Sequence, residues 1–172
     1  IVHKINKIPK KNLKGDSLIT NKKGIALGIL TADCAPVLIY DPVNNLISAL
    51  HVGWKGAYKK IIFTTLKKFN SNGSNFKDLI AVIGACIEKS NYEVKSDFFK
   101  KFIKQEKRNE KFFNIKNNKI YFSLNAYIKN HFLKLGVKNI EILKKDTYLS
   151  SNNFFSARRS IKNKLNDYGR NI

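Results

Sequence analysis

Two residues in the first third of the chain have side chains that bind transition metals and lie at the ends of predicted strands. Cys34 is part of the segment TADCAP (31–36), and His51 opens the segment HVGWKG (51–56). A thiolate sulfur and an imidazole nitrogen are ligands for zinc or copper. Three protein donors would leave one coordination position open for water or substrate, as in catalytic zinc sites. The pattern therefore favours a metal site completed by a donor from elsewhere in the chain.

The same pair permits two other interpretations. Free cysteine is among the most buried residue types, so Cys34 and His51 could both be structural. Alternatively, a Cys34 thiolate activated by His51 could be the nucleophile of a hydrolase, which an alkylating reagent would inactivate without any metal. The only other cysteine is Cys86. Two cysteines are too few for a disulfide framework, and we expect free thiols.

Strands and helices alternate around these segments, and a turn at 41–45 favours an antiparallel hairpin. This predicts a mixed-sheet α/β or α+β domain with helices flanking layered sheets, not a doubly wound fold. The predicted strands are 25–30, 37–40, 46–51, 79–83, 120–122 and 137–143, with strand-like patches at 18–20 and around His3. The predicted helices are 56–69, a helix from Ser96 or Asp97 to about Gln105, and one from Ser123 to Gly136. Residues 106–118 are predicted to be an exposed excursion, and the tail from Asp146 to be irregular.

The composition bounds the class of protein. A chain of 172 residues with 43% hydrophobic residues suits one globular domain, 1–172. No apolar run approaches the roughly 18 residues that span a bilayer, and the first residues do not form a signal peptide. We therefore expect a soluble, cytoplasmic protein that does not bind membranes. The chain contains no methionine, from which we expect it to lack its N-terminal segment.

The charge is strongly positive, with 33 Lys and Arg against 12 Asp and Glu and a net charge of +21. A nucleic-acid-binding surface would concentrate this charge and use arginine for bidentate contacts. Here the lysines are spread along the whole chain, and the arginines are only Arg108, Arg158, Arg159 and Arg170. We do not expect nucleic-acid binding, although a non-enzymatic basic domain remains an alternative.

The central segment closely resembles the signature of the YfiH-like family, which is also described as laccase-domain or polyphenol oxidase. It reads ILTADCAPVLIYDPVNNLISALHVGWKG (29–56). Four further stretches resemble family segments in the same order: GDSLIT (15–20), IGACIEKSNYEV (83–94), FFSARRS (154–160) and YGR (168–170). The resemblance therefore covers almost the whole chain. One departure is Asp146, which stands where relatives tend to have cysteine.

The resemblance implies a fold of layered mixed sheets and a metal site of one cysteine and two histidines. Cys34 and His51 match the signature directly, and His3 stands where the family has a Q-x-H segment, with Ile1 in place of the glutamine. Asp33, beside Cys34, is expected to orient a ligand or accept a proton. We interpret His131, which has no match in the family, as an ordinary helix residue.

The family is described either as a copper-dependent phenol oxidase or as a zinc-dependent enzyme of purine nucleosides. A multicopper oxidase needs on the order of ten histidines, and this chain has three. We therefore favour one Zn²⁺ and phosphorolysis of adenosine, inosine, guanosine or methylthioadenosine, with possible deamination of adenosine. The predicted phosphate ligands are Lys55, Gly56, Arg158 and Arg159. A copper-binding polyphenol oxidase and a catalytically decayed basic member of the family are the alternatives.

Overall fold

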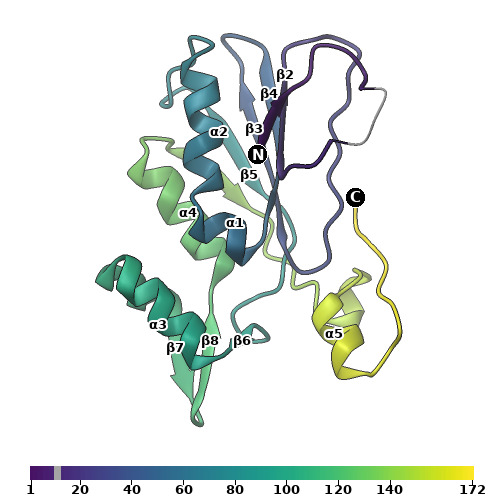
Figure 1. The fold of residues 1–172 in the computed structure, drawn as a ribbon, viewed down its shortest axis with the longest axis vertical. Helices are drawn as coiled ribbons and strands as arrows, with labels where there is room; N and C mark the ends of the chain where they lie inside the picture. The colour runs from purple at the N-terminus through teal and green to yellow at the C-terminus, as the bar shows by residue number, and fades with distance from the viewer. Residues whose placement is uncertain (10–12) are drawn as a thin grey trace.

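The computed structural model describes residues 1–9 and 13–172, and its centre is a six-stranded mixed sheet (Figure 1). The order across the sheet is β1-β2-β4-β3-β5-β9. The strands are β1 (Val2–Lys4), β2 (Ser17–Thr20), β3 (Ala35–Asp41), β4 (Leu46–Val52), β5 (Ile80–Ile83) and β9 (Asn139–Ile142). The outer pairs β1–β2 and β5–β9 are parallel, whereas the three inner pairs are antiparallel. The expected mixed-sheet α/β class is confirmed.

The predicted hairpin is confirmed as the pair β3–β4, the longest in the sheet. Its turn is closed by the carboxylate of Asp41, which accepts the backbone N–H of Val43 at 2.9 Å and that of Asn44 at 3.1 Å. This hairpin fixes the register that sets Ala35 opposite Val52 and Pro36 opposite His51. The turn chemistry thereby brings the beginning of β3 and the end of β4 to the same end of the sheet.

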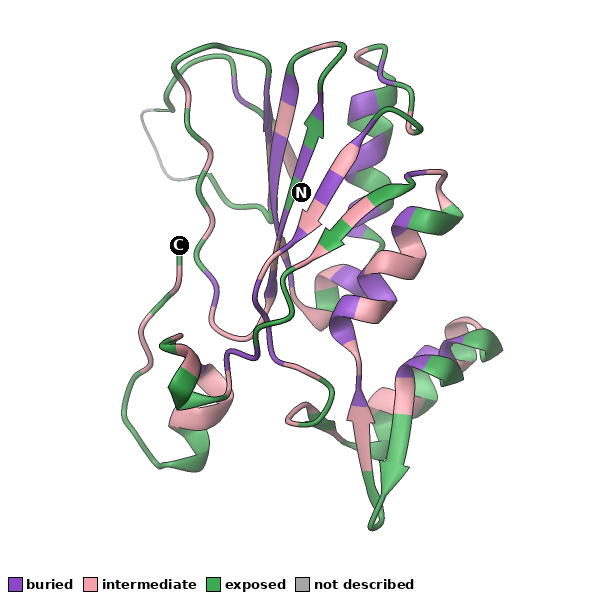
Figure 2. Cartoon of the chain, turned by 180° about the vertical axis from the view of Figure 1, so that it is seen from behind, coloured by how far each residue is buried: buried purple, intermediate pink, exposed green. Residues whose placement is uncertain are grey.

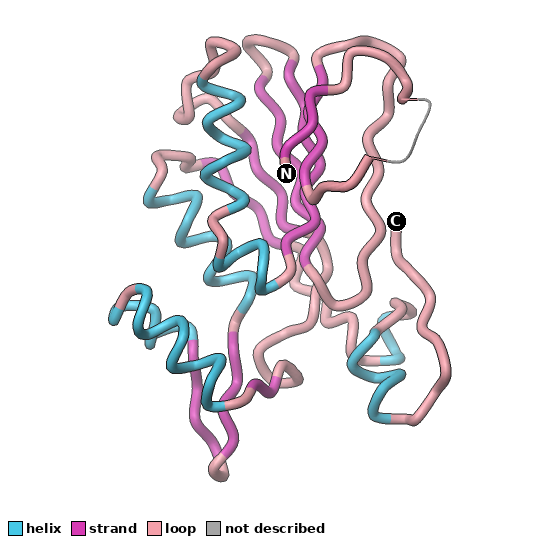
Figure 3. Tube along the Cα trace, in the orientation of Figure 1, coloured by secondary structure: helices cyan, strands magenta, loops and turns pink. Residues whose placement is uncertain are grey.

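In the described residues, three helices cover one face of this sheet. They are α1 (Trp54–Tyr58), α2 (Ile61–Asn70) and α4 (Leu124–Lys134), and the buried residues gather between them and the strands (Figure 2). The long loop after β2 and the C-terminal tail lie on the other side of the sheet (Figure 3). There Leu38 and Tyr40 are 52% and 39% exposed, so this face is apolar but incompletely covered.

A smaller unit projects below the main sheet (Figure 1). It comprises the sheet β6-β8-β7, with β6 (Glu93–Val94), β7 (Phe113–Lys116) and β8 (Lys119–Phe122), the helix α3 (Ser96–Gln105) and the 3₁₀ helix η1 (Lys107–Phe112). An aromatic cluster fills it, including Phe98 stacked on Phe102 at 4.7 Å and Phe122 at 5.0 Å from Phe102. The unit is therefore built around aromatic side chains.

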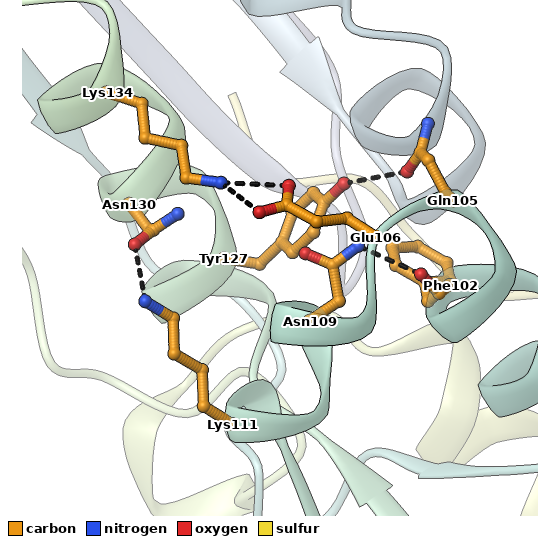
Figure 4. Close-up of polar contacts among 8 residues, drawn as sticks. All are labelled: Phe102, Gln105, Glu106, Asn109, Lys111, Tyr127, Asn130 and Lys134. Carbon is orange, nitrogen blue, oxygen red and sulfur yellow. Dashed lines mark hydrogen bonds and ion pairs between the residues drawn. The ribbon is translucent and has the colours of Figure 1, made fainter.

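Polar contacts fasten this smaller unit to α4 (Figure 4). Nζ of Lys134 donates to both carboxylate oxygens of Glu106, at 2.6 and 2.8 Å, and Lys111 donates to Asn130 at 2.8 Å. The Tyr127 hydroxyl donates to Gln105 at 3.3 Å. The helix α3 is thus held in place relative to the main sheet.

Three sequence predictions need correction. Residues 25–30 form no strand; this segment is a loop in which Leu27 lines a pocket together with residues of the open sheet face. The predicted helix 56–69 is two helices, because Lys60 adopts a left-handed conformation at φ 60° and interrupts it. Residues 106–118 are not merely an exposed excursion, since η1 and β7 form there and Asn109 and Phe112 are buried.

The C-terminal region contains the 3₁₀ helix η2 (Ser150–Asn152) and the helix α5 (Ala157–Lys162) within the tail predicted to be irregular. Ser156 caps α5 by accepting the backbone N–H of Arg159 at 3.1 Å. No helix in residues 1–9 and 13–172 is long and apolar enough to cross a membrane.

Candidate active site

The three predicted metal donors lie at one end of the main sheet. Strands β1, β2 and β3 begin there and β4 ends there, as their pairing registers require. His51 is the penultimate residue of β4, and its backbone N–H donates to the carbonyl of Asp16 at 2.8 Å. Cys34 immediately precedes β3. The hairpin register therefore explains why residues far apart in sequence meet at this end.

Cys34 and His51 converge on Gly53. A Cβ atom at Gly53 would lie 2.7 Å from Sγ of Cys34 and 4.0 Å from Nε2 of His51. The sulfur and the imidazole nitrogen therefore border the same small space, and the shorter distance leaves no room for a side chain at Gly53. The structure brings together these two predicted donors.

The surroundings of Cys34 are acidic and partly dry. Burial and, to a smaller extent, the carboxylates of Asp33 and Asp16 together raise the pKa of the Cys34 thiol to about 11. The unliganded thiol is consequently protonated at neutral pH. The same negative charges favour a cation beside the sulfur.

His3 points to a different partner. Its Nε2 lies 2.8 Å from the carbonyl oxygen of Lys14, and its ring packs against Gly15. Gly15 precedes Asp16, the neighbour of His51, so His3 is at the correct end of the sheet. Within residues 1–9 and 13–172, however, no three His, Cys, Asp or Glu side chains are gathered closely enough to hold a metal ion. Cys34 and His51 are therefore placed to act as two ligands of one metal ion. His3 does not lie beside them in this conformation.

Asp33 connects the Cys34 loop to the C-terminal region. It adopts a left-handed conformation at φ 76°, which an aspartate tolerates better than most residues. One carboxylate oxygen accepts the hydroxyl of Thr147 at 2.7 Å, and the other accepts the backbone N–H of Arg158 at 2.6 Å. Both oxygens are engaged, so the geometry favours anchoring over proton transfer.

The two arginines predicted to bind phosphate differ in their contacts. The guanidinium of Arg159 donates to the main-chain carbonyls of Thr147, Tyr148 and Phe154 at 2.5–2.9 Å, so it holds the C-terminal region together. The guanidinium of Arg158 lies 5.5 Å from the Tyr92 ring and donates one hydrogen bond, to the carbonyl of Glu93 at 2.9 Å. Arg158 therefore uses one of its five guanidinium N–H donors and Arg159 uses three, so Arg158 has more donors left for a ligand.

Lys55 and Gly56 lie inside α1, which begins at Trp54 and not at Gly56 as predicted. The N–H group of Ala57, after Gly56, already donates to the carbonyl of Gly53 at 2.9 Å. This N–H is therefore not free to bind an anion. The prediction that the backbone after Gly56 binds phosphate at a helix start was wrong for this group. Nζ of Lys55 lies 5.7 Å from the Trp54 ring centroid, at the edge of the same region.

Sequence reasoning missed Tyr92 and Asp16 as neighbours of this site. Burial raises the pKa of Tyr92; a Cys34 thiolate would raise it as well, Arg158 lowers it and Asp33 raises it, so its ring lies near the Cys34 loop. Tyr92 belongs to the stretch IGACIEKSNYEV that resembles the family. That resemblance was the available signal, but it did not indicate which residue of the stretch faces the site.

Comparison with known proteins places the chain in a family. All of it, residues 1–172, matches the family described as multi-copper polyphenol oxidoreductase laccase. A protein of Rickettsia conorii named purine nucleoside phosphorylase is 38% identical over 149 residues, which are 86% of this chain and 61% of that protein. One of Bacteroides thetaiotaomicron with the same name is 33% identical over 154 residues, 84% of this chain and 55% of that protein.

Solved structures agree in fold. The Bacillus licheniformis protein YfiH superposes with a TM-score of 0.80 at 31% identity, covering 90% of this chain and 58% of that one. YlmD of Geobacillus stearothermophilus, at 22% identity and a TM-score of 0.78, shares the fold. The chain thus spans somewhat more than half the length of these relatives. From the match over all of its residues and the shared fold, the chain belongs to the YfiH-like family described as multi-copper polyphenol oxidoreductase laccase.

Proposed function

We propose that the protein is a purine nucleoside phosphorylase acting on adenosine, inosine, guanosine or methylthioadenosine with inorganic phosphate. The observation that supports this most directly is the convergence of Cys34 and His51 on Gly53, in a chain whose relatives carry the name purine nucleoside phosphorylase. In the reaction, a phosphate oxygen bonds to C1′ of the ribose while the bond from C1′ to the base nitrogen breaks. Hydrogen phosphate gives up its proton as its oxygen bonds to C1′, and the departing base nitrogen takes up a proton, so the base leaves in its neutral form.

We further propose that Cys34, His51 and His3 hold one Zn²⁺. Cys34 and His51 already border one space, whereas His3 would have to leave the Lys14 carbonyl, 2.8 Å away, to join them. When bound, such an ion would polarise an oxygen ligand as a Lewis acid and lower the pKa of water, which is also the chemistry of adenosine deamination.

The remaining residues would position the reactants. Asp33 fixes the turn that presents Cys34 and anchors the backbone of Arg158. Arg158 and Lys55 supply positive charge for phosphate near the pair, and the acidic Asp16 balances a bound cation. Arg159 contributes by holding the C-terminal region through main-chain carbonyls.

The test is direct. Purified protein is incubated with zinc and with inosine or adenosine, with and without phosphate, and the free base and deaminated product are separated by chromatography. We expect phosphate-dependent release of base that Cys34→Ala abolishes. Base release independent of phosphate, or unchanged by Cys34→Ala, would contradict the proposal.

A copper-dependent polyphenol oxidase is the second candidate, favoured by the description of the matching family. The three histidines of the chain argue against a multicopper centre. Oxygen consumption with a phenol and added copper, measured beside the nucleoside assay, separates the two functions.

A further inference from the structure

The segment 168–172, which we call the C-terminal strap, lies beside the segment that leads into Cys34 (Figure 2). The backbone N–H of Thr31 donates to the carbonyl of Asn171 at 2.9 Å, and the N–H of Asn171 donates to the carbonyl of Thr31 at 2.8 Å. The two residues thus form an isolated antiparallel bridge. Thr31 is only 2% exposed and precedes Cys34 by three residues. The position of the strap therefore affects the position of the Cys34 loop.

The side chain of Asn171 fastens the strap to the residues before α5. Its Oδ1 accepts the backbone N–H of Phe155 at 2.9 Å, and its Nδ2 donates to the carbonyl of Phe155 at 3.0 Å. An amide side chain offers both an acceptor and a donor, whereas a carboxylate offers acceptors alone. The strap also lies directly against the Phe155 ring, because a Cβ atom at Gly169 would be 2.5 Å from that ring.

These contacts form a closed circuit with Asp33. Three residues after Phe155, the backbone N–H of Arg158 donates to a carboxylate oxygen of Asp33 at 2.6 Å. The strap therefore holds Thr31, and α5 holds Asp33, while Asn171 ties the strap and α5 together. Because the short segment 31–33 is held at both ends, the direction in which the chain enters the next residue, the predicted metal ligand, is restricted.

We propose that Asn171 is a positioning residue for Cys34. By tying the strap to Phe155, it makes Thr31 and Asp33 move as one unit with α5, and this unit holds the Cys34 thiol in the site. The inference rests on the proposed zinc site only for its consequence, which is that a thiol already in place binds zinc more tightly. Removing the partners that orient metal ligands commonly costs about 10- to 100-fold in metal affinity, and Asn171 acts one step further away, so we expect about three- to tenfold.

The first test uses the metal-free protein and needs no turnover. The whole protein is treated with iodoacetamide at one pH, and the modification of its two cysteines is followed by mass spectrometry. Cys34 is half-buried, whereas Cys86 is 1% exposed, so Cys86 reports on opening of the whole fold. In Asn171→Ala we expect Cys34 to react faster by about threefold or more, because two hydrogen bonds that oppose local opening are lost. The rate at Cys86 should not change.

Asn72→Ala is the matched control. Asn72 is also half-buried, and its side chain makes two hydrogen bonds, with the carbonyl of Lys68 and with Nζ of Lys4. It follows the end of α2, at the opposite end of the main sheet from Cys34, so both cysteines should react as in wild type. Asn171→Asp keeps the acceptor for Phe155 and loses the donor. It should raise the rate at Cys34 by a smaller factor, and it replaces Asn171→Ala if that variant does not fold.

The second test measures zinc affinity at one pH by competition with a chromophoric chelator. We expect zinc binding to weaken by about three- to tenfold in Asn171→Ala and to stay unchanged in Asn72→Ala. Cobalt(II) in place of zinc gives a charge-transfer band when a thiolate binds it, so its absorbance shows whether Cys34 is a ligand in each variant.

The outcomes separate this role from the proposed function. Faster reaction of Cys34 alone, with weaker zinc binding, supports the positioning role whether or not the protein releases base from nucleosides. An unchanged rate at Cys34, or an unchanged zinc affinity, in Asn171→Ala overturns it even if phosphorolysis is found. Equal increases at Cys34 and Cys86 also overturn it, because they indicate a general loss of stability. If the wild type binds no zinc, the metal site is refuted and the iodoacetamide comparison alone decides the role of Asn171.

Discussion

At the scale of single residues, the site depends on how closely atoms approach Gly53. Its hydrogen atoms occupy the space where Sγ of Cys34 and Nε2 of His51 come near each other. This requirement is steric, because the φ of Gly53 is −82° and any residue could adopt it. The glycine is needed for the donors beside it and not for its backbone.

We predict that Gly53→Ala displaces Cys34 and lowers both zinc binding and turnover. Its Cβ would lie 2.7 Å from Sγ, an overlap that costs about 1–3 kcal/mol of unfolding free energy. Urea unfolding and the zinc content after dialysis measure the two effects. Gly28→Ala is the control, because its Cβ would meet Ile172 at an ordinary 3.6 Å. A fully active, zinc-loaded Gly53→Ala protein would refute this steric account.

A second prediction concerns whether Asp33 anchors or transfers a proton. Asp33→Asn can keep both hydrogen bonds, by accepting from Arg158 and donating to Thr147, so we expect stability within about 1 kcal/mol of wild type and substantial turnover. Asp33→Ala loses both bonds and should cost about 2–4 kcal/mol. If Asp33 were a general base, Asp33→Asn would instead lose about 10²- to 10⁴-fold in rate while remaining stable.

Some residues of this site can be predicted from the sequence and others cannot. Cys34 and His51 are predictable because they lie at the ends of the two strands of one hairpin, whose short turn leaves a single register. The roles of Asp33, Arg158 and Arg159 are not, because they depend on where the C-terminal tail meets the Cys34 loop. Such a long-range contact leaves no periodicity in the sequence.

At the scale of elements, most segments with an alternating or helical apolar pattern form the strand or helix that the pattern predicts. The predictions were wrong where contacts with the rest of the fold outweigh the local pattern. The apolar run 25–30 places Leu27 at a pocket on the open sheet face and adds no strand to the sheet. The helical pattern of 56–69 continues across Lys60, although the chain there is left-handed. The spacing of apolar side chains cannot reveal that one residue within the pattern has a positive φ.

The junction of α1 and α2 gives a prediction at this scale. Lys60 adopts φ 60° and ψ 41°, a conformation that costs a residue with a Cβ about 1–2 kcal/mol. Lys60→Gly relieves this strain and should stabilise the protein by about 0.5–1 kcal/mol after the added freedom of the unfolded chain is counted. Lys59→Gly, at φ −80°, should destabilise it. Equal effects of the two substitutions in urea unfolding would contradict this explanation.

The helix α4 provides a pH-dependent prediction. Burial lowers the pKa of His131, the Lys134 and Lys60 charges lower it further, and Glu106 opposes them. Above the ordinary value of about 6.5, His131 is neutral in both states and carries no penalty. As the pH falls below that value, the unfolded chain binds the proton first, so stability decreases.

We therefore expect the unfolding free energy to fall between pH 7.5 and pH 5.5, and to fall less in His131→Gln. Urea unfolding at the two pH values measures this difference, and carboxylate titrations contribute equally to both proteins. An identical pH dependence of wild type and His131→Gln would show that His131 does not contribute.

At the scale of the whole molecule, the positive charge is not concentrated on one element. The strand β1, the helices α2, α3 and α4, and the hairpin of β7 and β8 all carry lysines. The pocket lined by Arg158 also contains Trp54, Tyr92 and the carboxylate of Glu93, a mixture that suits a small ligand better than a phosphate backbone. Charge of this kind produces weak, unspecific attraction to polyanions.

We predict no specific binding of nucleic acid: any association with duplex DNA shows no sequence preference, and its affinity falls by more than about tenfold between about 50 and 200 mM salt, since counterion release would be the dominant contribution. Fluorescence anisotropy with two unrelated duplexes of equal length measures this. Arg158→Gln should change the affinity no more than Lys100→Gln, because each removes one positive charge among 33. A duplex preferred at 200 mM salt, with Arg158→Gln abolishing that preference, would instead establish nucleic-acid recognition at Arg158 and favour a basic binding domain over an enzyme.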